Sequence, residues 1–513
     1  MLEMKQLKFL FLTLFFVGNI LVNVCYADDI TIRYNGSQAK ITQTRKDSVK
    51  VIVDGAKVNI ESLYQNHKLT LCLKGKSNDG QLILKTLGKA KLTLDNLNLT
   101  SQEGAPIHLK NKKKVEVVAA KGTENTLTIT ACNDTANHKA ATLWAKDKLL
   151  FSGKGKLNII ATGNGCRGIK SKKDINIEDI TLNVTTSGDN LGEKPFGPPG
   201  GFPGGLEGMP KFNPDDIPEE VKKQFEEMRK QFEGKMPNDS TRHFGPPGFP
   251  GGMPPFGGMR PEAGDNIKGD SPEFGGGFAG KHKYVASTKG ITTKGKITIN
   301  SGNITVRTSS AGAEGIEGKE GVVLNGGNVD VLSTDDAINA GACIEFNGAK
   351  VIARSTGNDA VDSNPQSGFF SPFGSNEQSD EPAIVIRDGA VYAWSQVGSP
   401  EEGLDCDFAA LIVEGGKVFS VGGGMGEMPS VPTNETAKQP TILLIGIGIA
   451  KDEPINIYNA SGKLLDTVTI PFSLRRSASL VSSPTFKIGN TYNIKTKDYE
   501  RTFTLKENFT IVR

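Results

Sequence analysis

Four short segments share one pattern of acidic and apolar residues: EGIE (314–317), DDAIN (335–339), NDAVD (358–362) and EEGLD (401–405). Each segment is centred on an apolar anchor, namely Ile316, Ile338, Val361 and Leu404, and Ile291 precedes them at the same kind of position. Successive anchors are 25, 22, 23 and 43 residues apart, and the long gap contains a Gly-, Ser- and Phe-rich excursion (365–382). A fixed period in this range predicts a solenoid.

Each repeat also contains two short apolar strands separated by a glycine turn, as at Asn325-Gly326, Asn347-Gly348 and Asp388-Gly389. The anchor supplies a third strand, so about 22 residues would complete one turn of the chain, whereas a propeller needs a period of about 40–50. The 61 glycines and the low aromatic content of 7% also favour β-structure with tight turns. We therefore predict an all-β fold, a right-handed single-stranded parallel β-helix.

Stacked repeats would also stack their carboxylates, about 4.8 Å apart from strand to strand. Because like charges in register repel, a cation is needed to neutralise them. Stacked carboxylates at this spacing fit calcium better than magnesium, because magnesium demands a tighter octahedral geometry and keeps more of its waters. The 5 histidines and scattered cysteines do not favour a transition metal. We predict a calcium-binding ladder, with a bare acidic face as the alternative. Its predicted ligands are Glu314, Glu317, Asp335, Asp336, Asn339, Asn358, Asp359, Asp362, Glu401, Glu402, Asp405 and Asp407.

Two arginines and two aromatic residues lie near this ladder in the repeat. Arg307 and Arg354 are predicted to point outward, where they would bind substrate carboxylates or pair with neighbouring acids. Counting from the glycine turns places Tyr392 and Trp394 in inward columns. This register favours a place in the core over a role in stacking against sugars.

The N-terminus resembles a secretory signal peptide (1–27). Lys5 and Lys8 precede an apolar run (9–24), and cleavage is predicted after Ala27. The mature protein would then be secreted, periplasmic or attached to the cell surface, and Cys25 leaves a lipoprotein as the alternative. No later segment approaches the ~18 apolar residues of a membrane span.

The period divides the rest of the chain. We predict N-terminal strands and first coils (28–190), an insert rich in Gly, Pro, Phe and Met (191–283), coils with the acidic ladder (284–432) and a C-terminal β cap (433–513). The composition of the insert predicts disorder with one short helix (218–232). A lid or a docking helix for a cell-surface partner is the alternative.

Charge and cysteine content exclude several classes of function. With 60 basic and 57 acidic residues the chain is nearly balanced, which argues against a nucleic-acid-binding protein. The five cysteines that follow the signal are scattered, so neither a disulfide framework nor a zinc site is predicted.

Several stretches resemble the secreted carbohydrate-binding β-helix family of clostridia and Bacteroidetes. They include LKGKSNDGQLIL (73–84), VEVVAAKGTENTLT (115–128), STDDAINA (333–340) and TGNDAVDSN (356–364). The resemblance implies a fold shaped like that of pectate lyases, and a non-catalytic protein that binds calcium and a cellulose- or polygalacturonate-like polysaccharide. It assigns the calcium to Asp335, Asp336, Asp359 and Asp362. Ala337 and Ala360 stand where several relatives have glycine.

Three functions follow as hypotheses. The first is a carbohydrate-binding protein in which calcium bridges to uronate carboxylates, assisted by Arg307 or Arg354. The second is a calcium-dependent polysaccharide lyase, for which Lys319 would be the base. The third is a structural adhesin or surface scaffold that makes contact through the insert.

Overall fold

The computed structural model describes residues 28–44, 47–132, 140–193, 284–365, 381–406, 409–423 and 429–512. The predicted signal peptide, nearly all of the insert with its predicted helix (218–232), and Asp407 lie outside these ranges. The chain divides into two compact units, Met1–Lys194 with His282–Arg513 and Pro195–Lys281. The described residues all lie in the first unit, and every regular element in them is a β-strand, which confirms the all-β class. They contain no helix that is long and apolar enough to cross a membrane.

The smaller of the two large sheets carries the repeated anchors. Its strands pair in parallel from β4 onward, and an antiparallel β3–β4 pair closes its N-terminal edge. Its eleven strands are β3 (Val49–Asp54), β4 (Lys57–Ser62), β6 (Gln81–Thr86), β8 (Ile107–Asn111), β11 (Ala141–Ala145), β14 (Arg167–Ser171), β19 (Ile291–Thr293), β22 (Ile316–Gly318), β25 (Ile338–Ala340), β27 (Val361–Ser363) and β29 (Leu404–Asp405).

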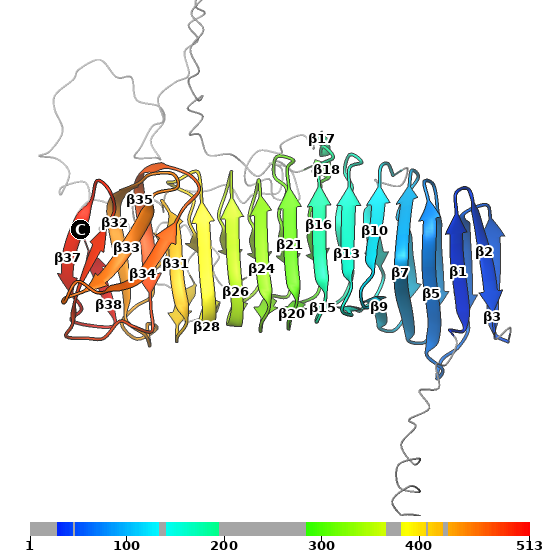
Figure 1. The fold of residues 1–513 in the computed structure, drawn as a ribbon, viewed down its shortest axis with the longest axis horizontal. Helices are drawn as coiled ribbons and strands as arrows, with labels where there is room; N and C mark the ends of the chain where they lie inside the picture. The colour runs from blue at the N-terminus through cyan, green and yellow to red at the C-terminus, as the bar shows by residue number, and fades with distance from the viewer. Residues whose placement is uncertain are drawn as a thin grey trace, which may run out of the picture. The chain divides into compact units, whose positions relative to one another are not determined.

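The larger sheet contains the other two strands of each repeat, and Figure 1 shows many of its strands standing side by side. Most of its pairings are parallel and join strands one repeat apart, such as β16–β21 and β21–β24. Its 21 strands are β1 (Ile30–Asn35), β2 (Gln38–Gln43), β5 (Leu69–Ser77), β7 (Ala90–Ser101), β9 (Val115–Ala119), β10 (Glu124–Ile129), β12 (Leu149–Ser152), β13 (Lys156–Ala161), β15 (Ile175–Ile177), β16 (Thr181–Thr186), β20 (Ile297–Ile299), β21 (Asn303–Thr308), β23 (Val322–Leu324), β24 (Asn328–Ser333), β26 (Ile344–Ser355), β28 (Pro382–Ser395), β30 (Ala410–Val413), β31 (Lys417–Gly422), β32 (Thr441–Ile449), β35 (Leu474–Ser482) and β38 (Phe509–Val512).

Two small antiparallel sheets complete the described structure. β17 (Leu191–Glu193) pairs with β18 (Tyr284–Ala286), so the chain enters and leaves the insert on neighbouring strands. Near the C-terminus, four strands form the second small sheet: β33 (Pro454–Asn459), β34 (Leu464–Thr469), β36 (Thr491–Lys495) and β37 (Glu500–Thr504).

The anchors form a stacked apolar column inside the repeats. Ile291 pairs with Ile316, which pairs with Ile338 and then with Val361, and all four side chains are fully buried. Since side chains alternate along a strand, the residue after each anchor must point outward. The same alternation that builds the core therefore lines up the polar side chains that follow each anchor.

Glycine at the turns allows the repeats to approach closely. Gly389 has a φ of +94°, and a Cβ at this position would lie 2.3 Å from the carbonyl oxygen of Ala349. A larger residue would meet both a backbone clash and a disfavoured conformation. The turn predicted at Asp388-Gly389 thus marks a place where only glycine fits.

The inward positions predicted for Tyr392 and Trp394 are wrong by one residue. Val351 pairs with Val391, and Ala353 pairs with Ala393, because the register shifts at a bulge between Asn347 and Lys350. The two aromatic side chains instead pack in a second apolar cluster with residues from the C-terminal strands.

This second cluster covers the last repeat. β31 pairs antiparallel with β35, which also pairs with β32, so the parallel edge is not left open. Phe419 of β31 packs in the same cluster as Ile442 and Val481. An edge paired in this way is protected against self-association. The predicted domain boundary at residue 433 stays a prediction.

Candidate carbohydrate and metal site

One outward column runs along the smaller sheet, one residue after each anchor. Lys170, Thr292, Glu317, Asn339, Asp362 and Asp405 are successive partners in its parallel registers. We call this the plus-one column. Within it the structure brings together four of the predicted ladder residues, one on each of four adjacent strands.

A second column lies two residues before each anchor, and we call it the minus-two column. The amide of Gly315 donates to the carbonyl of Asp336 (2.9 Å), and the amide of Ala360 donates to that of Glu402 (3.0 Å). Together with Ala337 N–H, which donates to the carbonyl of Asp359, these bonds stack Glu314, Asp336, Asp359 and Glu402 on successive repeats. The two columns flank the same anchors, so their side chains form a double row of acids.

Two acids of the minus-two column meet a third carboxylate, that of Asp335, at one point. Glu314, Asp335 and Asp336 each offer an oxygen atom, and these three oxygens lie within 4.8 Å of one another. Oxygens that bind one calcium ion at 2.3–2.6 Å can be at most about 5 Å apart. The spacing therefore fits the coordination of a single calcium ion.

Asp336 has one carboxylate oxygen whose hydrogen-bonding capacity is not satisfied. Its Oδ2 accepts a hydrogen bond from Asn339 Nδ2 (2.8 Å), but its Oδ1 is buried and has no hydrogen-bond partner. The residue is only 3% exposed. Burial raises the pKa of Asp336 well above its ordinary value, and the negative charges of Asp362 and Asp335 raise it further. A buried carboxylate oxygen without a partner is costly and is the kind of atom that a cation would satisfy.

Amide side chains separate the carboxylates next to Asp336. Asn339 Nδ2 donates to both Asp336 Oδ2 and Asp362 Oδ2, each at 2.8 Å. In the same way Asn358 Nδ2 donates to Asp335 Oδ1 (2.8 Å). These amides reduce the repulsion without adding positive charge. Among the described residues, no lysine or arginine forms an ion pair with Asp335, Asp336 or Asp359.

Asp359 continues the row toward the C-terminus. Its Oδ1 accepts a hydrogen bond from the backbone amide of Glu402, whose Oε2 accepts from Ser430 N (2.7 Å). Asp405 Oδ1 accepts from Ser430 Oγ (3.3 Å). Burial, followed by the charge of Asp405, raises the pKa of Asp359 to about 9. Glu401, also predicted as a ligand, is half-buried beside Glu402.

Glu314 and Glu317, the acids of the first repeat in the ladder, are neutralised by lysines of the protein itself. Lys289 Nζ lies 2.6 Å from Glu314 Oε2 and 2.9 Å from Glu317 Oε1, and Thr292 Oγ1 donates to Glu317 Oε2 (2.6 Å). Burial opposes the charged form of Glu317, but the ion pairs with Lys289 and Lys319 hold its pKa well below the ordinary value. The acids without a paired lysine thus begin at the next repeat, with Asp335 and Asp336. Lys289 was missed from the sequence, although it stands two residues before anchor Ile291.

Lys319, the predicted base of a lyase, is held in an ion pair with Glu317. An ammonium group in an ion pair offers no lone pair to accept a proton. This arrangement fits a structural cation better than a general base.

Arg307 and Arg354 both bind one acid on the larger sheet. Arg307 Nη2 lies 2.7 Å from Asp330 Oδ2, and Arg354 Nη2 lies 2.6 Å from Asp330 Oδ1. These contacts match the alternative of pairing with neighbouring acids. Their role in binding a substrate stays a prediction.

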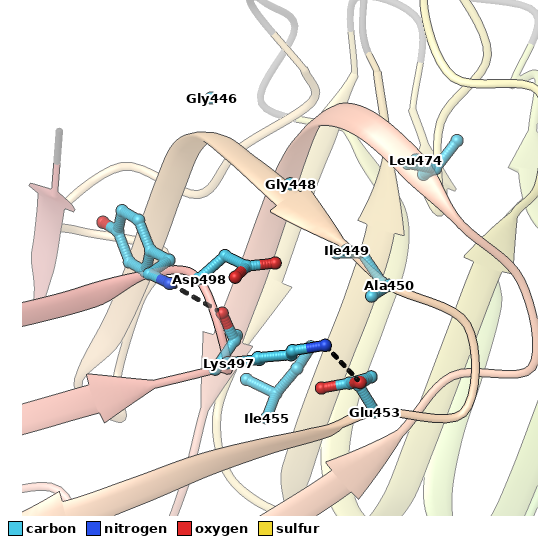
Figure 2. Close-up of a pocket in the computed structure, with 11 residues that line it drawn as sticks. Gly446, Gly448, Ile449, Ala450, Glu453, Ile455, Leu474, Lys497 and Asp498 are labelled. Carbon is cyan, nitrogen blue, oxygen red and sulfur yellow. Dashed lines mark hydrogen bonds and ion pairs between the residues drawn. The ribbon is translucent and has the colours of Figure 1, made fainter.

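A cavity of about 370 Å³ lies among the C-terminal strands (Figure 2). Lys497 Nζ and Glu453 Oε1 approach to 3.8 Å there, and Gly446, Gly448 and Asp498 also line it. None of the predicted ladder residues lines this cavity. Its charges are not stacked on successive repeats, so it does not share the chemistry of the ladder.

Comparisons with known proteins agree with the resemblance found in the sequence. The profile of a family described as "Carbohydrate-binding domain-containing protein" matches residues 54–194 and 276–360. A relative with the same description, from Acetivibrio thermocellus, is 31% identical over 154 residues, which are 27% of this chain and 53% of that protein. The match thus spans about half the length of that relative. These matches confirm the resemblance to the carbohydrate-binding domain-containing family.

A solved structure was also found, described as the polysaccharide lyase-like protein from C. thermocellum, gadolinium derivative. It has 18% sequence identity and a TM-score of 0.39, and the match covers 63% of this chain and 90% of that one.

Proposed function

We propose that this protein is a secreted, non-catalytic carbohydrate-binding protein that holds calcium on its acidic ladder and binds an acidic cell-wall polysaccharide. The scaffold for this function would be a right-handed parallel β-helix, since three strands per repeat pair in parallel with those of the next. The observation that carries the proposal is the buried Asp336 Oδ1, which has no hydrogen-bond partner and lies in a stacked row of carboxylates.

Carbohydrate as the ligand is supported by the family match over residues 54–194 and 276–360. The second of these segments contains Glu314, Asp335, Asp336 and Asp359. These four acids of the candidate site therefore lie inside the part of the chain that resembles carbohydrate-binding proteins, whereas Asp362, Glu401, Glu402 and Asp405 follow it.

Calcium as the cofactor is supported by the donor set. Glu314, Asp335 and Asp336 would hold an ion at one place, and Asp359, Asp362, Glu402 and Asp405 extend the same row. All are oxygen donors, which suit calcium. Bound there, calcium would supply positive charge for the carboxylate of an acidic sugar. The protein's own part is to fix these oxygens on rigid strands, with Asn339 and Asn358 holding the carboxylates apart.

Binding without catalysis is supported by the state of Lys319, whose ammonium group is engaged by Glu317. A calcium-dependent lyase is the second candidate function because its chemistry needs the same metal site. It predicts an unsaturated uronide product that absorbs ultraviolet light, whereas the binding function predicts retained polymer and no product.

The direct test measures binding of polygalacturonate, by calorimetry, to the chain that follows Ala27, with calcium and after chelation. We expect binding that requires calcium and leaves the polymer uncut. An equal affinity in the presence of chelator would rule out the calcium-dependent function. Deleting the insert (residues 191–283) distinguishes the third hypothesis, a structural adhesin. Loss of binding in that variant would assign the activity to the insert.

A further inference from the structure

A column of lysines lies on the smaller sheet, on the N-terminal side of the acidic ladder. Lys85 of β6 pairs with Lys110 of β8 in the parallel register. Backbone hydrogen bonds continue the column, since Lys146 N–H donates to the carbonyl of Leu109 (2.9 Å) and each later lysine donates in the same way to the residue before its neighbour. We call this column the lysine strip, and it takes one residue from the end of each of six adjacent strands: Lys85, Lys110, Lys146, Lys172, Lys294 and Lys319.

All six residues of the lysine strip are exposed, and four of them have no acidic partner. At the two ends of the strip, Lys85 pairs with Glu61 and Lys319 pairs with Glu317. Because parallel strands are about 4.8 Å apart, the lysines between these ends form a row of positive charge with roughly that spacing. Within the described ranges of the chain, no carboxylate forms an ion pair with these lysines, which are Lys110, Lys146, Lys172 and Lys294.

The stability of the fold does not account for this row. Like charges directly opposite each other on neighbouring strands are destabilising. Elsewhere the chain has opposite charges in such places, as where Lys156 of β13 pairs with Glu124 of β10 (2.8 Å), and beside the strip Lys148 pairs with Asp174 (2.8 Å). Lysines also protect sheet edges from self-association, but the strip crosses the middle of its sheet, where every strand is paired on both sides. A negatively charged ligand explains the row better than either structural role.

We propose that the lysine strip binds the carboxylates of an acidic polysaccharide that lies across the strands, along the stack of repeats. A uronate polymer carries one carboxylate on every sugar ring, so its charges repeat along the polymer as the lysines repeat along the sheet. The strip ends at Lys319, and the acidic ladder begins beside it at Glu317. One polymer would thus contact ammonium groups on the earlier repeats and calcium on the later ones. This inference rests on the proposed function, because it assigns a second contact to the same polysaccharide.

The test measures binding of oligogalacturonate to the chain that follows Ala27, by calorimetry with calcium present and at two salt concentrations. The strip variant replaces the four unpaired lysines and is Lys110→Gln, Lys146→Gln, Lys172→Gln and Lys294→Gln combined. Its matched control removes the same number of charges from exposed lysines that lie outside the smaller sheet and form no ion pair among the described residues. The control variant is Lys76→Gln, Lys121→Gln, Lys350→Gln and Lys487→Gln combined.

We expect the strip variant to bind oligogalacturonate about tenfold or more weakly than wild type, because exposed ion pairs are weak singly but four are lost together. Its affinity should also depend less on salt, since fewer counterions are released on binding. The control variant should stay close to wild type, and both variants should keep the wild-type affinity for calcium. The melting temperature of the strip variant should equal or exceed that of wild type, because neighbouring like charges are removed.

Equal affinity for oligogalacturonate in the strip variant and its control would overturn the role of the lysine strip, and a calcium requirement in wild type would leave the proposed function standing. If chelation does not change the affinity of wild type but the strip variant loses binding, the calcium-dependent function fails and the strip stands. A carboxyl-reduced, neutral oligomer and a single-stranded oligonucleotide of equal charge test the class of ligand. Binding of either one as tightly as oligogalacturonate would contradict a carboxylate-bearing polysaccharide as the partner of the strip.

Discussion

Among single residues, Asp336 is the one on which the proposed calcium site most depends. Its Oδ1 is buried without a partner, and its Oδ2 shares an amide donor with Asp362. The sequence predicted that Asp336 and Asp359 would stack, because the anchors repeat at a nearly constant spacing. It could not predict the depth of burial or the missing hydrogen bond, since both depend on neighbours from other repeats.

Asp336→Asn should stabilise the protein from which a chelator has removed calcium, and it should abolish calcium binding by Glu314, Asp335 and residue 336. The amide cannot ionise, so it avoids the cost of a buried negative charge, and it places a donor beside the carboxylates of Glu314 and Asp335. Since an unsatisfied buried polar group costs roughly 1–3 kcal/mol, a gain of about that size is expected in denaturant unfolding. The control is Asp54→Asn, whose carboxylate is exposed on β3. A variant that still binds calcium as wild type does would remove Asp336 from the site.

The pH dependence of stability gives a second prediction at this scale. The pKa of Asp359 rises from an ordinary 3.8 to about 9 on folding, so the folded state holds this proton more tightly than the unfolded state. Its contribution to stability is therefore fully present below about pH 4 and is lost as the pH rises through about 9.

In the chelated protein, the melting temperature should accordingly fall between pH 5 and pH 9 by more than it does in Asp359→Asn. Calcium should flatten this slope, because it compensates the ionised carboxylates. An identical slope in wild type and variant would contradict the assigned burial of Asp359.

Among the strands, the position of a side chain depends on how neighbouring repeats pair, and the sequence of a single strand does not reveal that pairing. The anchors and turns are local patterns, so the period revealed them. The bulge between Asn347 and Lys350 is a property of the pairing of β26 with β28, which is why Tyr392 was placed one position out. Lys289 was overlooked for a similar reason, as its partners lie on the next repeat.

Lys289→Met should be strongly destabilising, whereas Lys319→Met should not. The side chain of Lys289 is 15% exposed and that of Glu317 is 5% exposed, so the change leaves buried carboxylates without their cation. Breaking a buried ion pair costs about 3–5 kcal/mol. Lys319 is 54% exposed and contacts the same glutamate, and a loss below about 1 kcal/mol is expected. Denaturant unfolding measures both, and equal losses would contradict the difference in burial.

At the scale of the whole molecule, the C-terminal strands close the open end of the repeats. β35 pairs with β31, and the cluster that contains Trp394 and Phe419 packs under the same strands. The sequence indicated this cap (433–513) because the repeat of the coils is lost near the C-terminus. It could not reveal which face the cap covers, since Trp394 was assigned to the interior.

Removing residues 441–513 should therefore expose an apolar face and a free strand edge, and cause self-association. Size-exclusion chromatography with light scattering measures this, with the intact chain as control. A truncated chain that stays monomeric and keeps its β-sheet signal would show that the cap is dispensable.

We infer that stacked repeats bring carboxylates close enough to hold a divalent ion. The most direct measurement is a crystal structure of the protein grown with calcium, phased so that the anomalous signal of the ion is visible. We expect an ion bound to Asp336 Oδ1 at about 2.3–2.6 Å, with Asp335 or Glu314 among its other ligands. A structure in which calcium is absent there, and a water or a protonated carboxyl satisfies Asp336 Oδ1, would contradict it.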